Sequence, residues 1–127
     1  MRLLGIDYGV RKMGLAVSSG TLAEPFKVIS VGSPEEALEK IGRIVKEEEI
    51  EKIVVGVSEG AMGKESEDFG KELERYLKIP VDFGDETLTS QDSLRLGIEA
   101  GMKRKKRKEM EDAFAASVML QSYIERK

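Results

Sequence analysis

The feature that most constrains the fold is an apolar run in the middle of the chain, Ile53-Val54-Val55-Gly56-Val57. Every residue in it except Gly56 is β-branched, and no polar residue interrupts it. Such a run is typical of a strand buried on both faces, as in parallel sheets covered by helices. We therefore expect an α/β fold with this strand near the centre of its sheet.

Hydrophobic periodicity predicts three strands before this run, at residues 3–7, 13–18 and 26–31, and one after it, at residues 79–83. The short connections between the first three strands favour antiparallel neighbours. Helices are predicted from the Ser33-Pro34-Glu35-Glu36 capping box, from about residue 64, and at residues 90–100 and 109–124. The order βββαβαβαα indicates one domain over residues 1–127, a mixed five-stranded sheet covered by helices, with sites at the carboxyl ends of its parallel strands.

Histidine and cysteine are both absent from the 127 residues. Their absence excludes a histidine general base, a cysteine nucleophile and a zinc site of the usual nitrogen and sulfur type. Carboxylates remain as the reactive groups, and their oxygens favour hard cations such as Mg²⁺ or Mn²⁺. Charged residues make up 35% of the chain at a net charge of −3, so any anion-binding face must be local.

Two short sequence patterns resemble those of serine hydrolases and of phosphate-binding loops, but each lacks a residue that the function requires. Residues 56–60, Gly56-Val57-Ser58-Glu59-Gly60, match the G-x-S-x-G pattern of serine hydrolases, but no histidine exists to accept the serine proton. Gly63-Lys64 does not complete a phosphate-binding loop, because Ser58 stands at the first glycine position and Glu65 replaces the required Ser or Thr.

Three acidic sites are candidates for catalysis and metal binding: Asp7, the pair Asp85-Glu86, and Asp112. Asp7 ends the first predicted strand between Gly5 and Gly9, which leave room for close approach to the backbone. The pair Asp85-Glu86 follows the last predicted strand, and Asp112 opens the last predicted helix. Each also has an ordinary structural explanation, since acidic residues are common at strand ends and in first helical turns.

Six consecutive cations lie just before Asp112 in a chain of negative net charge. A basic run of this kind is a candidate phosphate-binding segment, and a solvated charged loop is the alternative. Its members are Lys103, Arg104, Lys105, Lys106, Arg107 and Lys108.

Several segments, in this order, resemble the YqgF/RuvX family of RNase H-like nucleases. They are residues 5–18, which begin Gly5-Ile6-Asp7-Tyr8-Gly9, the central apolar run, Asp85-Glu86-Thr87-Leu88-Thr89, and Asp112-Ala113-Phe114-Ala115-Ala116 with the basic run before it. The resemblance spans nearly the whole chain. It implies an RNase H-like fold and catalytic, metal-binding roles for Asp7, Glu86 and Asp112, with Mg²⁺ or Mn²⁺ as cofactor. Arg11 and Lys12 are expected to contact nucleic acid together with the basic run.

The family is associated with processing of the 5′ end of pre-16S ribosomal RNA, and its members were earlier described as Holliday junction resolvases. The resemblance therefore implies a metal-dependent endonuclease that acts on RNA, with ribosomal precursor particles as partners. A junction resolvase and a non-catalytic ribosome-assembly factor remain alternatives. An actin-like phosphotransferase is disfavoured by size, since such enzymes close two domains around a nucleotide.

This sequence departs from the family pattern at two places. Ser58-Glu59 stands where Pro and Asn are usual, and Thr87 stands where Arg is usual. Both changes make the expected pocket more acidic and concern substrate contacts more than metal binding. The sequence has no apolar run long enough to span a bilayer and no apolar leader, so we expect a cytoplasmic protein, as a monomer or a homodimer.

Overall fold

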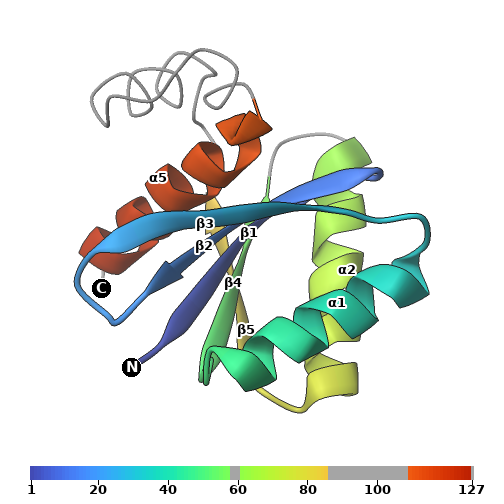
Figure 1. Ribbon diagram of the computed structural model, residues 1–127, viewed down its shortest axis with the longest axis horizontal. Coiled ribbons are helices and arrows are strands. Elements are labelled where there is room, and N and C mark those ends of the chain that lie inside the picture. Colours follow the sequence, from blue (N-terminus) through green and yellow to red (C-terminus); the bar gives the residue numbers. More distant parts are fainter. Residues whose placement is uncertain (58–60, 86–108, 127) are drawn as a thin grey trace.

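The computed structural model describes residues 1–57, 61–85 and 109–126. Its strands form a five-stranded sheet in the order β3-β2-β1-β4-β5 (Figure 1). The strands are Leu3–Asp7 (β1), Lys12–Ser18 (β2), Ala23–Ser30 (β3), Lys52–Val57 (β4) and Val81–Asp85 (β5). The helices in these ranges are Pro34–Glu47 (α1), Ala61–Leu77 (α2) and Glu111–Arg126 (α5).

The sheet is mixed, as predicted. β2 runs antiparallel to both β1 and β3, whereas β4 runs parallel to both β1 and β5. The central apolar run forms β4, between β1 and β5. Because β1, β4 and β5 are mutually parallel, their carboxyl ends lie along one edge of the sheet. Asp7 is the last residue of β1 and so lies on that edge.

Several element boundaries differ from the prediction, among them those of β3, α2 and β5, which spans residues 81–85 rather than 79–83. β3 begins at Ala23, three residues before the predicted start. The prediction began the strand after Pro25, because proline is unfavourable inside a sheet, but proline is tolerated on an edge strand such as β3. A register shift between Leu15 and Ala16 accommodates the irregularity. α2 begins at Ala61, before the expected residue 64. The helix predicted at residues 90–100 lies outside the described residues.

Helix α1 begins as its capping residues predict. The Ser33 hydroxyl accepts a hydrogen bond from the Glu36 N–H at 3.1 Å, and Pro34 occupies the first helical position. The Glu36 carboxylate in turn accepts from the Gly32 N–H at 2.9 Å, one residue before the usual partner. Lys40 and the Gly32 N–H hold the pKa of Glu36 below its ordinary value.

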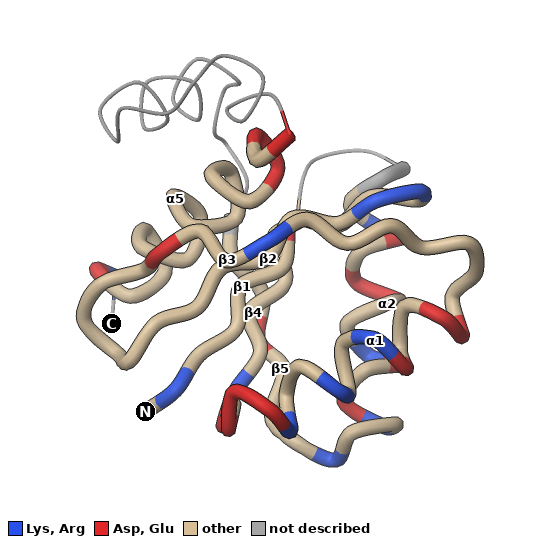
Figure 2. Tube along the Cα trace, viewed as in Figure 1, with Lys and Arg blue, Asp and Glu red and all other residues tan. Residues whose placement is uncertain are grey.

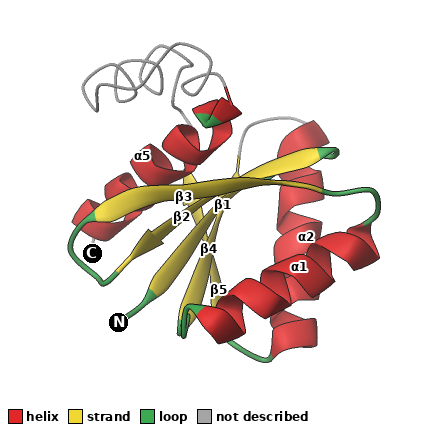
Figure 3. Ribbon diagram, in the orientation of Figure 1, coloured by secondary structure: helices red, strands yellow, loops and turns green. Residues whose placement is uncertain are grey.

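Helices cover both faces of the sheet: α1 and α2 lie on one face and α5 on the other (Figure 3). Side chains alternate along each strand, so each strand contributes to both layers. The layer under α1 and α2 contains Leu4, Ile6, Met13, Leu15, Ile29, Ile41, Ile44, Ile53, Val55, Phe69 and Leu73, among others. The layer under α5 contains Leu3, Ala16, Val54, Ala116, Met119, Leu120 and Tyr123.

The C-terminal half of α5 is fixed to the sheet by a polar cluster. The Tyr123 hydroxyl donates a hydrogen bond to Asp82 Oδ2 at 2.7 Å, and Lys52 Nζ lies 3.6 Å from the same oxygen. The hydrogen bond with Tyr123 and the charge of Asp82 raise the pKa of Lys52. These contacts join α5 to β4 and β5 and set the helix's position over the sheet. No helix in the described ranges has the length and apolar character needed to cross a bilayer.

Candidate active site at the carboxyl edge of the sheet

Asp7 ends β1 on the face of the sheet that α5 covers. Leu3 packs in the layer under α5, and a Cβ built on Gly5 would lie 3.0 Å from Leu120 Cβ of α5. Side chains two residues apart share a face of a strand, so Asp7 follows Leu3 and Gly5 onto this face. Tyr8, the next residue, packs against the opposite layer.

The first turn of α5 lies directly on Gly14 of β2. A Cβ built on Gly14 would overlap the carbonyl group of Asp112, so only glycine lets the helix approach this closely. Gly14 is also the direct cross-strand partner of Asp7. Directly opposed residues of an antiparallel pair share a face and lie within about 5.5 Å of each other at Cα. Asp7 and Asp112 are therefore brought together over Gly14.

Lys12 supplies a positive charge at this point. It begins β2, and its Nζ lies 3.3 Å from Asp112 Oδ2. The Lys12 side chain is 63% exposed and that of Asp112 is 32% exposed, so solvent reaches both. Figure 2 shows the acidic first turn of α5, which contains Glu111 and Asp112. Negative charge is favourable at a helix N-terminus, which supports this placement.

Arg11 lies at the β1–β2 turn with an exposed side chain. Its described hydrogen bond is through the backbone, since its carbonyl oxygen accepts from the Val31 N–H at 2.8 Å. Of the two cations predicted to contact nucleic acid here, Lys12 touches a candidate catalytic carboxylate. Arg11 lies next to it and faces solvent.

The other predicted site residues lie outside the described residues. These are Glu86, the basic run at 103–108, and the departures at Ser58, Glu59 and Thr87. Within residues 1–57, 61–85 and 109–126, no three acidic side chains gather in a way that could hold a metal ion. Asp7 and Asp112 are hard oxygen donors, the type that Mg²⁺ and Mn²⁺ prefer, and a lysine ammonium already lies at one of them. These two carboxylates, Asp7 and Asp112, are thus ligands of the type that fits a hard divalent cation.

Tyr8 is a site neighbour that sequence reasoning did not identify. Its ring centroid lies 5.2 Å from that of Phe69 in α2, at an interplanar angle of 46°. Burial and the nearby carboxylates Glu65 and Glu72 raise the pKa of the Tyr8 hydroxyl. Strand alternation was the available signal, because it places Tyr8 next to Asp7 but on the opposite face.

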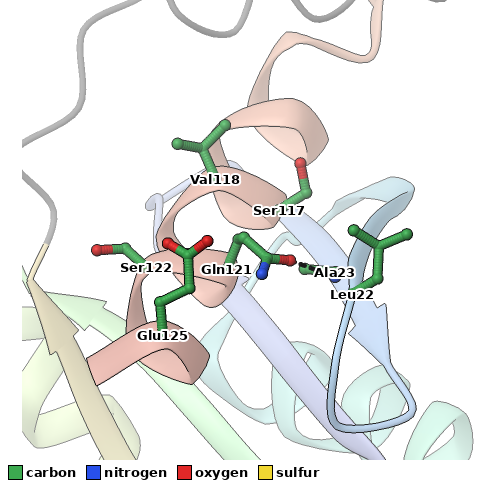
Figure 4. A pocket seen from close by; sticks show the side chains of 7 residues that line it. All are labelled: Leu22, Ala23, Ser117, Val118, Gln121, Ser122 and Glu125. Carbon is green, nitrogen blue, oxygen red and sulfur yellow. Dashed lines mark hydrogen bonds between the residues drawn. The ribbon is translucent and has the colours of Figure 1, made fainter. Parts of the chain in front are cut away.

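A pocket of about 450 Å³ is lined by α5, from Ser117 to Glu125, and by Leu22 and Ala23 (Figure 4). It contains no predicted site residue. Gln121 crosses it and accepts a hydrogen bond from the Ala23 N–H at 2.7 Å. The contact holds the β2–β3 turn against α5, and we assign the pocket no part in the candidate active site.

Curated relatives match almost the whole chain. A protein of Halothermothrix orenii is 40% identical over 132 residues, which cover 98% of this chain and 94% of that relative. A protein of Caldanaerobacter subterraneus subsp. tengcongensis is 40% identical over 134 residues, covering 98% of this chain and 96% of the relative. Both carry the name "Putative pre-16S rRNA nuclease".

Solved structures agree on the fold. T. thermophilus RuvC in complex with a Holliday junction substrate superposes with a TM-score of 0.64 at 14% identity, covering 99% of this chain and 96% of that chain. Fowlpox virus resolvase in complex with Holliday junction DNA gives a TM-score of 0.67 at 14% identity, covering 99% and 98%. At this identity the likeness shows the fold alone, which is RNase H-like.

The sequence profile of the RuvX family, described as "Holliday junction resolvase", matches residues 1–126. The match leaves out only the last residue of the chain. Together with relatives at 40% identity over nearly their full length, it settles the family. The chain belongs to the RuvX (YqgF) family of nucleases.

Proposed function

We propose that this protein is a metal-dependent nuclease that hydrolyses phosphodiester bonds in structured RNA, at the 5′ end of pre-16S ribosomal RNA. The observation that carries the proposal is the convergence of Asp7 and Asp112 on Gly14. Two acidic residues from different elements are close together there, at the carboxyl edge of a sheet, where α/β proteins place their sites.

Asp7, Asp112 and Glu86 are the residues that would hold the cation. Glu86 enters the set by its sequence position, directly after β5, and by the family resemblance. When bound, a divalent cation would neutralise charge on the phosphate and lower the pKa of the attacking water. The carboxylates would fix the position of the cation and so of its positive charge. No histidine is available, so proton transfer to an imidazole plays no part.

The basic residues bind and orient the substrate in this account. Lys12 stands next to Asp112, where an ammonium group would contact the phosphate beside the one that is cleaved. Arg11 and the basic run, Lys103 to Lys108, would hold flanking phosphates. Phosphate contacts fix the register of a nucleic acid without reading its bases. Sequence or shape selectivity must therefore come from other contacts.

The RNA assignment rests on the names of the curated relatives. Ribosomal precursor particles would then be the partners, and the cytoplasm the place of action. The family description favours a second candidate, cleavage of a four-way DNA junction. Junction cleavage requires two symmetrically presented sites, and hence a dimer.

The decisive experiment compares both substrates side by side. A precursor fragment that spans the 5′ end of 16S ribosomal RNA and a four-way DNA junction are incubated with the protein and Mg²⁺, with excess EDTA as the control. We expect cleavage of the RNA at a defined position in Mg²⁺ and none in EDTA. Cleavage of the junction alone would favour the second candidate, and cleavage of either substrate in EDTA would contradict the metal-dependent mechanism.

A further inference from the structure

A second pocket lies between the β1–β2 turn and the start of α1, at the same edge of the sheet as Asp7 but on the face that α1 and α2 cover. Its volume is about 120 Å³. Its floor is buried and apolar, formed by Met13, Val31, Ala37 and Phe69. Its rim includes Val10, whose side chain is 62% exposed, and Ser33 at the start of α1. The pocket is apolar inside and opens near the sheet edge that carries Asp7.

Tyr8 is one of the residues that line the pocket. Tyr8 directly follows Asp7, so their Cα atoms are about 3.8 Å apart. A second aromatic residue of the lining, Phe69, packs against Tyr8 with the ring centroids 5.2 Å apart. Proteins that recognise single-stranded nucleic acid bind unpaired bases against aromatic rings in this way.

The charges around the pocket favour a neutral base over a phosphate as its occupant. Burial and the charges of Glu65 and Glu72 raise the pKa of the Tyr8 hydroxyl, so the negative charge near Tyr8 disfavours an anion beside it. A neutral base with amino groups suits this environment. Arg11 and Lys12 lie on the same turn but outside the pocket, where they can meet the phosphates on either side of the base.

We propose that this pocket receives one unpaired nucleobase of the strand whose phosphate lies at Asp7. The inference rests on the proposed nuclease function and narrows its substrate to nucleic acid that is single-stranded, or has a base turned out of its helix, next to the cleaved bond. A base held in a duplex is stacked and paired and cannot enter. By holding one base, the pocket determines which phosphodiester bond of the strand is placed at Asp7.

The test is an abasic scan of substrate binding in EDTA, which removes cleavage from the measurement. Single abasic nucleotides are placed in turn at each position around the cleaved bond of the RNA fragment, and affinity is measured for each oligomer. We expect one position to weaken binding by about fivefold to a hundredfold, the range for stacking of one base on an aromatic ring. The neighbouring positions should change affinity little.

Two variants test whether the base at the sensitive position binds in the pocket. Ala37→Met fills the floor, and Val10→Gln makes the rim polar without touching the core. Both should bind the intact oligomer more weakly than the unmodified protein, and both should lose most of the penalty at the sensitive position. Leu22→Gln is the matched control, because Leu22 is 64% exposed on the distant β2–β3 turn and should keep the full penalty.

A uniform abasic profile, or the same penalty in Val10→Gln as in Leu22→Gln, would overturn the inference. Cleavage in Mg²⁺ is measured separately with the same oligomers. Cleavage with a uniform profile would leave the nuclease function standing without the base pocket. A sensitive position without cleavage would identify a binding pocket on a protein that does not hydrolyse this RNA.

Discussion

Gly14 of β2 and Asp112 of α5 lie in direct contact, with the backbone of the helix resting where a side chain on the strand would be. Gly14 is also paired across the sheet with Asp7. One glycine therefore determines how closely two acidic residues from distant parts of the sequence approach each other. The Tyr123–Asp82 hydrogen bond fixes the other end of the same helix.

Replacing Gly14 with alanine should displace the first turn of α5. The new Cβ meets backbone atoms, which have no rotamer to move into, so we expect the free energy of unfolding to fall by about 1–3 kcal/mol. Displacement of Asp112 by about 1 Å should lower the cleavage rate by about 100-fold. Chemical denaturation and a single-turnover cleavage assay measure the two effects.

Gly42→Ala is the matched control for this substitution. A Cβ there would lie 3.1 Å from Leu77 Cδ2, at the end of a side chain that can move, and far from the candidate site. It should leave cleavage unchanged. Equal activity in Gly14→Ala and Gly42→Ala would show that the position of Asp112 does not matter for the reaction.

Lys12→Gln should raise the affinity for Mn²⁺ by up to about fivefold. The lysine ammonium lies at a carboxylate oxygen of Asp112, one of the residues that would hold the metal ion, and exposed ion pairs of this kind contribute about 0–1 kcal/mol. Isothermal titration calorimetry with Mn²⁺ provides the measurement, and Lys71→Gln on the exposed face of α2 is the control. An unchanged Mn²⁺ affinity would mean that Lys12 does not compete with the cation.

The basic run at residues 103–108 should act as an electrostatic clamp on the substrate. If about three of its cations touch phosphates, replacing the run with Ser and Gly should flatten the slope of log affinity against log salt concentration by about two to three. The loss of affinity should be similar for RNA and DNA and for unrelated sequences. An unchanged slope on both substrates would identify the run as a solvated loop.

Glu36 should make stability depend on acidic pH. Lys40 and the Gly32 N–H lower its pKa in the folded protein, so its carboxylate stabilises the fold at pH values above its ordinary pKa of 4.5. That contribution is lost as the pH falls through the lowered value. Glu36→Gln should therefore reduce Tm at pH 7 and have little effect near pH 2. A reduction in Tm that stays constant over this range would contradict the assignment.

Much of the sheet could be predicted from the sequence because each strand carries a local signal. The run 53–57 is apolar on both faces, and it forms the strand between β1 and β5. The start of β3 was predicted too late, because the tolerance of Pro25 depends on its place at the sheet edge. That place is a property of the assembled sheet, which no local pattern reveals.

The site was predicted less completely than the fold. Asp7 and Asp112 were proposed as site residues from their positions at the end of a strand and the start of a helix, and the fold brings both to Gly14, but their catalytic role stays a prediction. The role of Gly14 itself was missed, because it depends on packing between segments about a hundred residues apart in sequence. Tyr8 and its pocket were missed for the same reason. Glu86 remains a prediction from sequence position and family resemblance.

The most direct test of the central claim is a calorimetric titration of Mn²⁺ into the unmodified protein and into Asp7→Asn, Asp112→Asn and Glu86→Gln. Each substitution removes one charged oxygen ligand and keeps the size of the side chain, so the fold should be retained and circular dichroism should be unchanged. We predict measurable Mn²⁺ binding to the unmodified protein and its loss in every variant, together with loss of cleavage. Mn²⁺ binding that persists unchanged in Asp7→Asn and Asp112→Asn would contradict the claim that these two carboxylates form the metal site.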